Sequence, residues 1–340
     1  MKVTIKDIAR KVQVSKTLVS LYLNDHPLSA KISAKISAKT KIRIDEAVRE
    51  LGYRPSFAAR ALAKGRTGTI GMIVGAIRDP FSYYLADLAM REVERYHCQL
   101  LLMMTNQDRR DRNRCLERLL ENRVDGVLCC SELPSDTPLY AELLARRFPL
   151  VAVNRKQADF SCIYNDFSPA VDELLAYLDS IGAETLYLIS AAGNRIAGLL
   201  RSGCTAHGIR LTASRNLVTD SDMEAICGTV LRRRPPFLFL TNCRAARVIV
   251  NEIRRAGIDY FPAIFTVYTL PADIIDDSRI AGAIQYNFTP LITCGLEILN
   301  RQLKASGTAE REEAVLPARF LRQDRFCELE TLGRYNFRTS

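Results

Sequence analysis

The sequence lacks the features that would assign it to several common functional classes. It has only three histidines in 340 residues, and none is spaced with cysteines or carboxylates as metal ligands are. It has no glycine-rich phosphate loop and no Gly-x-Ser-x-Gly nucleophile motif. No apolar run approaches membrane-spanning length, and the charged N-terminus has no signal-peptide core. We therefore expect a cytoplasmic protein with no membrane association, no metal, no cofactor and no enzymatic activity.

The cysteine pattern does not indicate disulfides. Ten cysteines are present, with no Cys-x-x-Cys pair, and most lie in apolar runs such as VLCCS. This pattern predicts buried thiols. Cys129 and Cys130 are adjacent, so a redox role is the alternative, although buried thiols are usually inert.

Excess positive charge is confined to the first fifth of the chain. Residues 1–66 hold 15 Lys and Arg and five Asp and Glu, a net charge of +10, which equals the formal net charge of the whole chain. The remainder holds 33 basic and 33 acidic residues. Such asymmetry is typical of a nucleic-acid-binding head on a neutral body. A solvated basic tail is the alternative, but regular apolar periodicity predicts a folded segment.

Two short helices are predicted at the N-terminus. Apolar residues recur at i, i+3, i+4 and i+7 in residues 5–12, where Thr4 and Asp7 are placed to form a capping box. A second helix follows Ser15, a natural N-cap. Its apolar face consists of Val19, Tyr22 and Leu23. Two helices so close together describe a helix-turn-helix or, by periodicity alone, another small helical bundle.

The segment TIKDIARKVQVSKTLVSLYLN resembles the N-terminal motif of the lactose-repressor (LacI/GalR) family. The resemblance implies that Lys16, Thr17 and Leu21 read bases in the major groove. It also implies that Ser15, Ser20 and Asn24 orient the helix on phosphates. Leu21 replaces a common arginine, so a contact with a thymine methyl is expected there instead of bidentate readout of guanine.

Residues 51–71, LGYRPSFAARALAKGRTGTIG, resemble the hinge of the same family. The resemblance implies a short helix over Ser56–Ala63 that folds only on DNA and pairs with a second subunit in the minor groove. Leu62 matches the residue that wedges a base step open, and Ala59 is one of the small neighbours that permit close approach. An ordinary linker helix is the alternative.

A basic insertion lies within residues 29–39, where the unit Ile-Ser-Ala-Lys occurs twice in succession. A period of four places Lys35 in one stripe with other lysines. The insertion either adds phosphate contacts beside the recognition helix or forms a solvated lysine face. A third helix is expected to match Ser37 to Leu51.

From Thr69 onward, short apolar strands alternate with amphipathic helices. This alternation predicts parallel, doubly wound sheets, and the number of units predicts two lobes. The candidate strands are TIGMIVGAI, CQLLLMMT, DGVLCCS, PLVAVN, ETLYLISA, PFLFLTN, AIFTVY and IAGAIQY. The body resembles the periplasmic-binding-protein-like core of the family, and stretches such as AETLYLIS resemble its fructose-repressor (catabolite repressor/activator) branch.

We expect three domains: a helix-turn-helix DNA-binding domain (1–54), a hinge helix and linker (55–68), and a two-lobed effector-binding and dimerisation core (69–340). The fold class is an all-α head plus an α/β core of two doubly wound lobes. The first lobe is expected at about 70–166 plus the chain near 290–325.

Ligands bind such folds at the carboxyl ends of strands. By resemblance and position, the candidate effector residues are Phe81, Arg155, Arg201, Asn242 and Thr269. Arg201 matches a family arginine that binds sugar or phosphate, or it is a surface arginine; Phe81 either stacks on a sugar or belongs to the core. The aspartate expected after AIFTVY is absent, with Tyr268 and Thr269 in its place, and Asn154 replaces an acid. Both departures indicate a ligand other than a neutral hexose, such as a sugar phosphate.

The resulting prediction is a homodimeric transcriptional regulator, usually a repressor in this family, that binds a pseudo-palindromic DNA operator. A sugar or sugar phosphate between the lobes would modulate operator affinity. A regulator that has lost its effector response is the main alternative. A secreted solute-binding protein would share the body but lack the basic head. The C-terminal ELETLGRYNFRTS has no heptad leucines, so no tetramer-forming zipper is expected.

Overall fold

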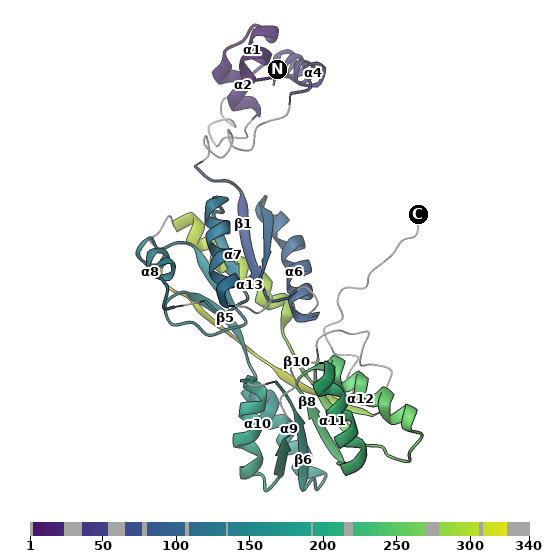
Figure 1. Cartoon of the computed structure of the whole chain (residues 1–340). Coiled ribbons are helices and arrows are strands. Elements are labelled where there is room, and N and C mark those ends of the chain that lie inside the picture. Colours follow the sequence, from purple (N-terminus) through teal and green to yellow (C-terminus); the bar gives the residue numbers. More distant parts are fainter. Residues whose placement is uncertain are drawn as a thin grey trace.

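The computed structural model describes residues 3–23, 36–53, 65–76, 80–105, 109–133, 135–191, 193–213, 220–268, 279–305 and 309–324. These residues form a small helical head followed by two α/β lobes (Figure 1). None of the helices in these ranges is long and apolar enough to cross a membrane.

The head consists of α1 (Ile5–Val12), α2 (Lys16–Leu23) and α4 (Ala38–Glu50). The Asp7 carboxylate accepts hydrogen bonds from the main-chain N–H (3.0 Å) and hydroxyl (2.7 Å) of Thr4, and Ser15 Oγ accepts from the N–H of Leu18 (3.1 Å). The two predicted helices, their caps and the third helix are therefore confirmed. The helices share one core, whose buried members are Ile8, Ala9, Val12, Val19, Ile44, Ala47 and Tyr53.

The turn between α1 and α2 requires left-handed backbone at Gln13, where φ is 57° and ψ is 46°. A residue with a Cβ costs about 1–2 kcal/mol in this conformation, and the head carries that cost.

The first lobe contains a six-stranded parallel sheet in the order β11-β5-β4-β3-β1-β2. Helices α6 and α13 pack on one face of the sheet, and α7 and α8 pack on the other. Its elements are β1 (Thr69–Val74), α6 (Pro80–Val93), the 3-10 helix η1 (Glu94–Tyr96), β2 (Gln99–Met104), α7 (Arg109–Glu121), β3 (Gly126–Cys129), α8 (Pro138–Ala145), β4 (Leu150–Val153), β5 (Ser161–Asp166), α13 (Phe288–Ala305) and β11 (Glu313–Pro317).

The second lobe has a sheet in the order β12-β10-β9-β8-β6-β7, in which only β12 is antiparallel to its neighbour. Helices α9 and α10 cover one face, and α11 and α12 cover the other. Its elements are α9 (Ser168–Ser180), β6 (Thr185–Ile189), α10 (Arg195–Ala206), β7 (Arg210–Ala213), α11 (Asp220–Arg233), β8 (Phe237–Leu240), α12 (Cys243–Ala256), β9 (Ala263–Tyr268), β10 (Ile280–Gln285) and β12 (Arg319–Arg322).

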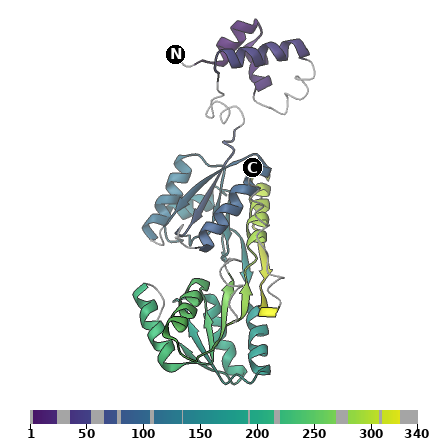
Figure 2. The same ribbon diagram turned by 90° about the vertical axis from the view of Figure 1, so that its right-hand side faces the viewer.

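The chain crosses between the lobes three times, from β5 to α9, from β10 to α13 and from β11 to β12 (Figure 2). The prediction that the chain near 290–325 belongs to the first lobe is correct for α13 and β11 and wrong for β12. Only Ala318 separates β11 from β12, so the chain passes directly from the first sheet, where β11 pairs with β5, to the second, where β12 pairs with β10.

A buried asparagine joins these crossovers. Asn165 is 1% exposed, and its Oδ1 accepts hydrogen bonds from the main-chain N–H (3.0 Å) and Nδ2 (2.9 Å) of Asn287. Nδ2 of Asn287 also donates to the main-chain oxygen of Pro317 (3.0 Å). One residue of each crossover is thus held in a single hydrogen-bonded cluster, which we call the hinge cluster: Asn165, Asn287 and Pro317.

The cysteines in the described ranges are free thiols, as predicted; Cys327 lies outside them. Burial raises the pKa of Cys129 to about 11 and raises that of Cys130 well above its ordinary value. Both groups are therefore held as neutral thiols at physiological pH, which disfavours the redox alternative.

Candidate nucleic-acid interface and ligand pocket

The exposed side of α2 carries the side chains predicted to contact DNA. Ser15, Lys16 and Thr17 are exposed at the start of the helix, while Ser20 and Leu21 are half-buried one turn later. Val19 is fully buried on the opposite side and fixes the rotation of the helix. The remaining predicted positions lie outside the described residues: Asn24, Lys35, Ala59 and Leu62.

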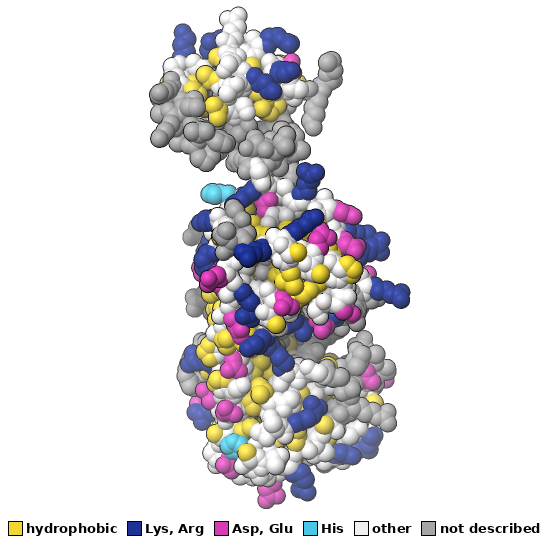
Figure 3. Space-filling model, turned by 90° about the vertical axis from the view of Figure 1, so that its left-hand side faces the viewer, with side chains coloured by type: hydrophobic (Ala, Val, Ile, Leu, Met, Phe, Trp, Pro, Cys, Tyr) yellow, Lys and Arg dark blue, Asp and Glu magenta, His cyan; other side chains and the backbone are white. Residues whose placement is uncertain are grey.

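Three acidic side chains of the described head are engaged away from this helix start. Asp7 lies 3.6 Å from Arg10, Glu50 pairs with Lys11, and Asp45 accepts a hydrogen bond from the Tyr22 hydroxyl (2.9 Å). Lys and Arg side chains are prominent on the head in Figure 3, whereas basic and acidic groups are mixed over the lobes. The start of α2 therefore presents Lys16 between the exposed residues Ser15 and Thr17, a surface suited to a phosphate backbone.

A pocket of about 380 Å³ lies between the two lobes. Its size falls within the range of about 300–1,000 Å³ that is usual for small-molecule sites. The residues that line it follow β4 and β5 of the first sheet and β6 and β10 of the second. They are Asn154, Arg155, Lys156, Phe167, Gly193, Asn194, Arg195, Ile196 and Tyr286. The pocket therefore sits at the carboxyl ends of strands from both lobes, as the fold predicts.

Arg195 is the central polar residue of this pocket. It follows Asn194, which caps α10 by accepting a hydrogen bond from the N–H of Ala197 (3.1 Å). Its guanidinium donates to the main-chain oxygen (3.2 Å) and Oδ1 (3.4 Å) of Asn154 and lies 5.3 Å from the centre of the Phe167 ring. Partial burial lowers the pKa of Arg195, but an arginine remains charged at neutral pH.

The lining favours an anion. Among the described residues that line the pocket, three are cationic, Arg155, Lys156 and Arg195, and none is acidic. The start of α10 adds the partial positive charge of a helix N-terminus. Basic side chains gather at the junction of the lobes on the face shown in Figure 3. Planar guanidinium groups bind phosphate or carboxylate oxygens in pairs, so this arrangement fits an anionic group.

The structure brings only part of the predicted effector set to this pocket. Arg155 lines it, whereas Arg201 is exposed further along α10 and is absent from its lining. Asn242 is exposed at the end of β8, also outside the lining, and Thr269 lies outside the described residues. Phe81 packs beside the pocket, with its ring 5.3 Å from that of Tyr286, in an aromatic cluster at the lobe junction.

Seven lining residues were missed from the sequence: Lys156, Phe167, Gly193, Asn194, Arg195, Ile196 and Tyr286. A usable signal existed for Arg195, because the first turn of a helix that follows a parallel strand lies at the carboxyl edge of the sheet. Arg201 lies nearly two turns further along the same helix and so points away from that edge.

The pocket is connected to the hinge cluster. Asn154 Oδ1, which accepts from Arg195, also accepts from Nδ2 of Asn165 (3.4 Å). A ligand that engages Arg195 would therefore act on a group bonded directly to the crossovers. The pocket and the crossovers are therefore joined by hydrogen bonds through Asn154.

The chain is similar to known regulators in both of its parts. Residues 4–56 match the family described as bacterial regulatory proteins, lacI family, and residues 67–205 match the periplasmic binding proteins and sugar-binding domain of the LacI family. The HTH-type transcriptional regulator PtxS of Pseudomonas plecoglossicida is 30% identical over 279 residues, which cover 76% of this chain and 77% of that protein. The chain belongs to the lacI family of bacterial regulatory proteins.

Other relatives of this lacI-family chain match over shorter lengths. The catabolite repressor/activator of Escherichia coli is 28% identical over 197 residues, or 57% of this chain. The matched region spans 58% of the length of that relative.

Solved structures confirm the two-lobed fold. The lac repressor dimer bound to operator and the anti-inducer ONPF superposes with a TM-score of 0.78 at 18% identity, covering 95% of this chain and 98% of that one. The Cra regulator of Pseudomonas putida in complex with fructose 1-phosphate gives a TM-score of 0.66 at 16% identity, covering 75% of this chain and 98% of that one.

Proposed function

We propose that this lacI-family chain is a transcriptional regulator whose affinity for a DNA operator is set by an anionic sugar, most simply a sugar phosphate, bound between its lobes. The observation that carries the effector proposal is the cationic pocket around Arg195. Fructose 1-phosphate, the ligand of the Pseudomonas putida Cra structure, has the required chemistry of hydroxyl groups and one phosphate.

The proposal includes no catalytic step and places the protein with the chromosome in the cytoplasm. The described lining of the pocket contains no carboxylate, thiol or imidazole that would act as a general base. The exposed residues at the start of α2 supply the DNA-reading surface, with domain boundaries at about residues 54 and 69.

The test is to select DNA sites with the full chain and then measure affinity for the selected site with and without fructose 1-phosphate. We expect a two-fold symmetric site and a change in its affinity when the ligand is added, because the pocket and the crossovers are linked. If the chain binds a symmetric site with the same affinity in the presence and in the absence of every anionic sugar tested, the result would instead support the constitutive alternative.

Thr17→Ala should lower the ratio of specific to non-specific affinity by about 1–3 kcal/mol if Thr17 reads a base.

A second copy of the chain is the proposed partner in the core. Tyr83 and Met90 lie seven residues apart on one side of α6 and are 46% and 54% exposed, and Met104 on the adjacent edge strand β2 is 43% exposed. An unpaired sheet edge beside exposed apolar side chains is suited to association with a second subunit.

Met90→Glu should weaken the dimer at least tenfold, because the interface would bury an unpaired charge. Sedimentation equilibrium of the full chain measures the change. Glu94→Gln is a surface control in the same region of the chain, and it should leave the dimer intact. If the dissociation constant of the Met90→Glu dimer is unchanged, this surface is not the dimer interface.

A further inference from the structure

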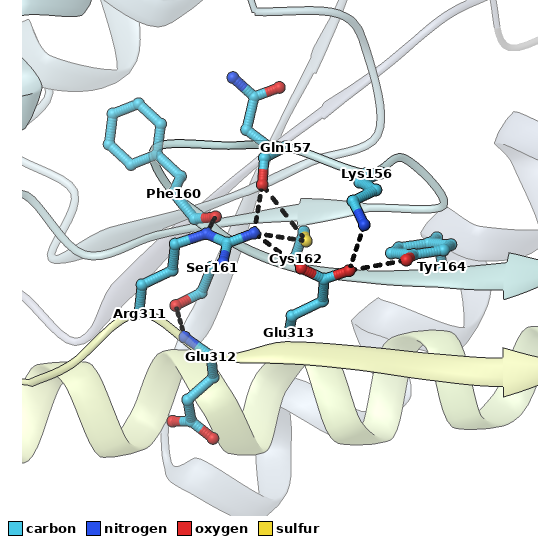
Figure 4. Close-up of polar contacts among 9 residues, drawn as sticks. All are labelled: Lys156, Gln157, Phe160, Ser161, Cys162, Tyr164, Arg311, Glu312 and Glu313. Atoms are coloured by element: carbon cyan, nitrogen blue, oxygen red, sulfur yellow. Dashed lines mark hydrogen bonds and ion pairs between the residues drawn. The ribbon is translucent and has the colours of Figure 1, made fainter.

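Lys156 belongs both to the effector pocket and to a cluster of polar side chains at the edge of the first lobe. It lines the pocket with Arg155 and Arg195, and its Nζ lies 3.0 Å from Oε1 of Glu313. Glu313 is the first residue of β11, the edge strand that pairs with β5. Figure 4 shows Lys156 and Tyr164 both directed at the Glu313 carboxylate.

Three donors hold the Glu313 carboxylate. Its Oε1 accepts from the Tyr164 hydroxyl (2.7 Å) as well as from Lys156, and its Oε2 accepts from Arg311 (2.9 Å). These hydrogen bonds, with that of Tyr164 the largest influence, lower the pKa of Glu313 to about 2. The carboxylate is therefore charged throughout the physiological pH range.

Lys156 is the replaceable member of this cluster. Arg311 is fixed independently, because its guanidinium also donates to the main-chain oxygens of Gln157 (2.6 Å) and Phe160 (3.2 Å). The side chain of Lys156 is 66% exposed, compared with 26% for that of Glu313. If Lys156 left, Glu313 would keep Tyr164 and Arg311, whereas an anion in the pocket would gain a third cation.

We propose that Glu313 is an internal counter-anion of the effector pocket: it holds Lys156 while the pocket is empty, and an anionic effector takes Lys156 from it. The inference rests on the proposed function, since it requires an anion in the pocket. Each binding event then breaks one ion pair as it forms another, so Glu313 sets the affinity below the value that a free Lys156 would give. The exchange also takes place on β11, which leads directly into the third crossover.

Glu313→Gln tests the proposal by removing the competing charge while keeping an acceptor for Tyr164 or Arg311. Titration calorimetry with fructose 1-phosphate should show binding about two- to fivefold tighter than in the unmodified chain, the range expected for an exposed ion pair. Lys156→Gln should weaken binding by a similar factor. In the double variant the gain from Glu313→Gln should vanish, because no lysine remains to be released.

Glu312→Gln is the matched control. Glu312 is the next residue and loses the same charge, but its carboxylate pairs with Arg301 (3.0 and 2.6 Å) and not with Lys156. This variant should bind the sugar phosphate as the unmodified chain does. Its carboxylate also points away from the cluster in Figure 4.

The outcomes separate this inference from the proposed function. If the unmodified chain binds fructose 1-phosphate but Glu313→Gln binds it equally well, the exchange is wrong and the sugar phosphate proposal stands. A gain that persists without Lys156 would show a general charge effect and also overturn the exchange. If no variant binds any of a panel of sugar phosphates, both proposals fail together.

Discussion

Arg195→Gln should lower the affinity for a sugar phosphate by about 2–3 kcal/mol, a factor of roughly 30 to 150 in the dissociation constant. The guanidinium is held in place by Asn154 and the Phe167 ring. Its removal deletes a charge-assisted contact where the surrounding protein has already excluded part of the water. Titration calorimetry with fructose 1-phosphate measures the loss.

Two further substitutions make this prediction specific. Arg201→Gln removes the same charge from the same helix at an exposed position outside the pocket lining, and it should change the affinity by less than about twofold. Arg195→Lys retains a charge but loses the planar pair of donors, so an intermediate affinity is expected. Equal losses for Arg195→Gln and Arg201→Gln would mean that the pocket does not bind the anion.

The sequence predicted the head well because its determinants are local. The capping residues Thr4, Asp7 and Ser15 lie within three residues of the groups they contact. The apolar period of the first helix is visible within the eight residues from 5 to 12. The apolar strands of the core were equally visible. Strands β5, β7, β11 and β12 were missed because they are short or contain polar residues. Tyr164 in β5 and Glu313 in β11 contact each other although they are about 150 residues apart along the chain.

The pocket was harder to predict because its residues come from four strand ends. Arg155 was identified from the family resemblance, in which an acid is common at the preceding position. The same resemblance indicated Arg201 and not Arg195, because a sequence match does not show which turn of α10 faces the other lobe. The family match over residues 4–56 and 67–205 supports the overall prediction, while the residue roles in the pocket remain predictions. Asn165 had no sequence signal, since an asparagine before an aspartate is usually interpreted as part of a loop.

Asn165→Ala should reduce the free energy of unfolding of the core by about 2–3 kcal/mol. The substitution leaves the partly buried main-chain N–H of Asn287 without its acceptor, and it also removes the donor that reaches Asn154 in the pocket. Thermal denaturation without ligand should show a decrease of several degrees. Asn122→Ala is the control, because that exposed asparagine makes a local bond to the main-chain oxygen of Arg118 and should cost less than about 0.5 kcal/mol.

The hinge cluster also predicts non-additivity. Asn165→Ala breaks both hydrogen bonds to Asn287, whereas Asn287→Ala breaks only the one that Nδ2 donates to Asn165. Because this bond is lost in both single variants, the double variant should be more stable than the sum of the single effects indicates, by about 1 kcal/mol. Additive effects would mean that the two residues stabilise the crossovers separately. Coupling would show that the crossovers are held as one unit, which is what a ligand bound at Arg195 needs in order to act on both lobes through Asn154.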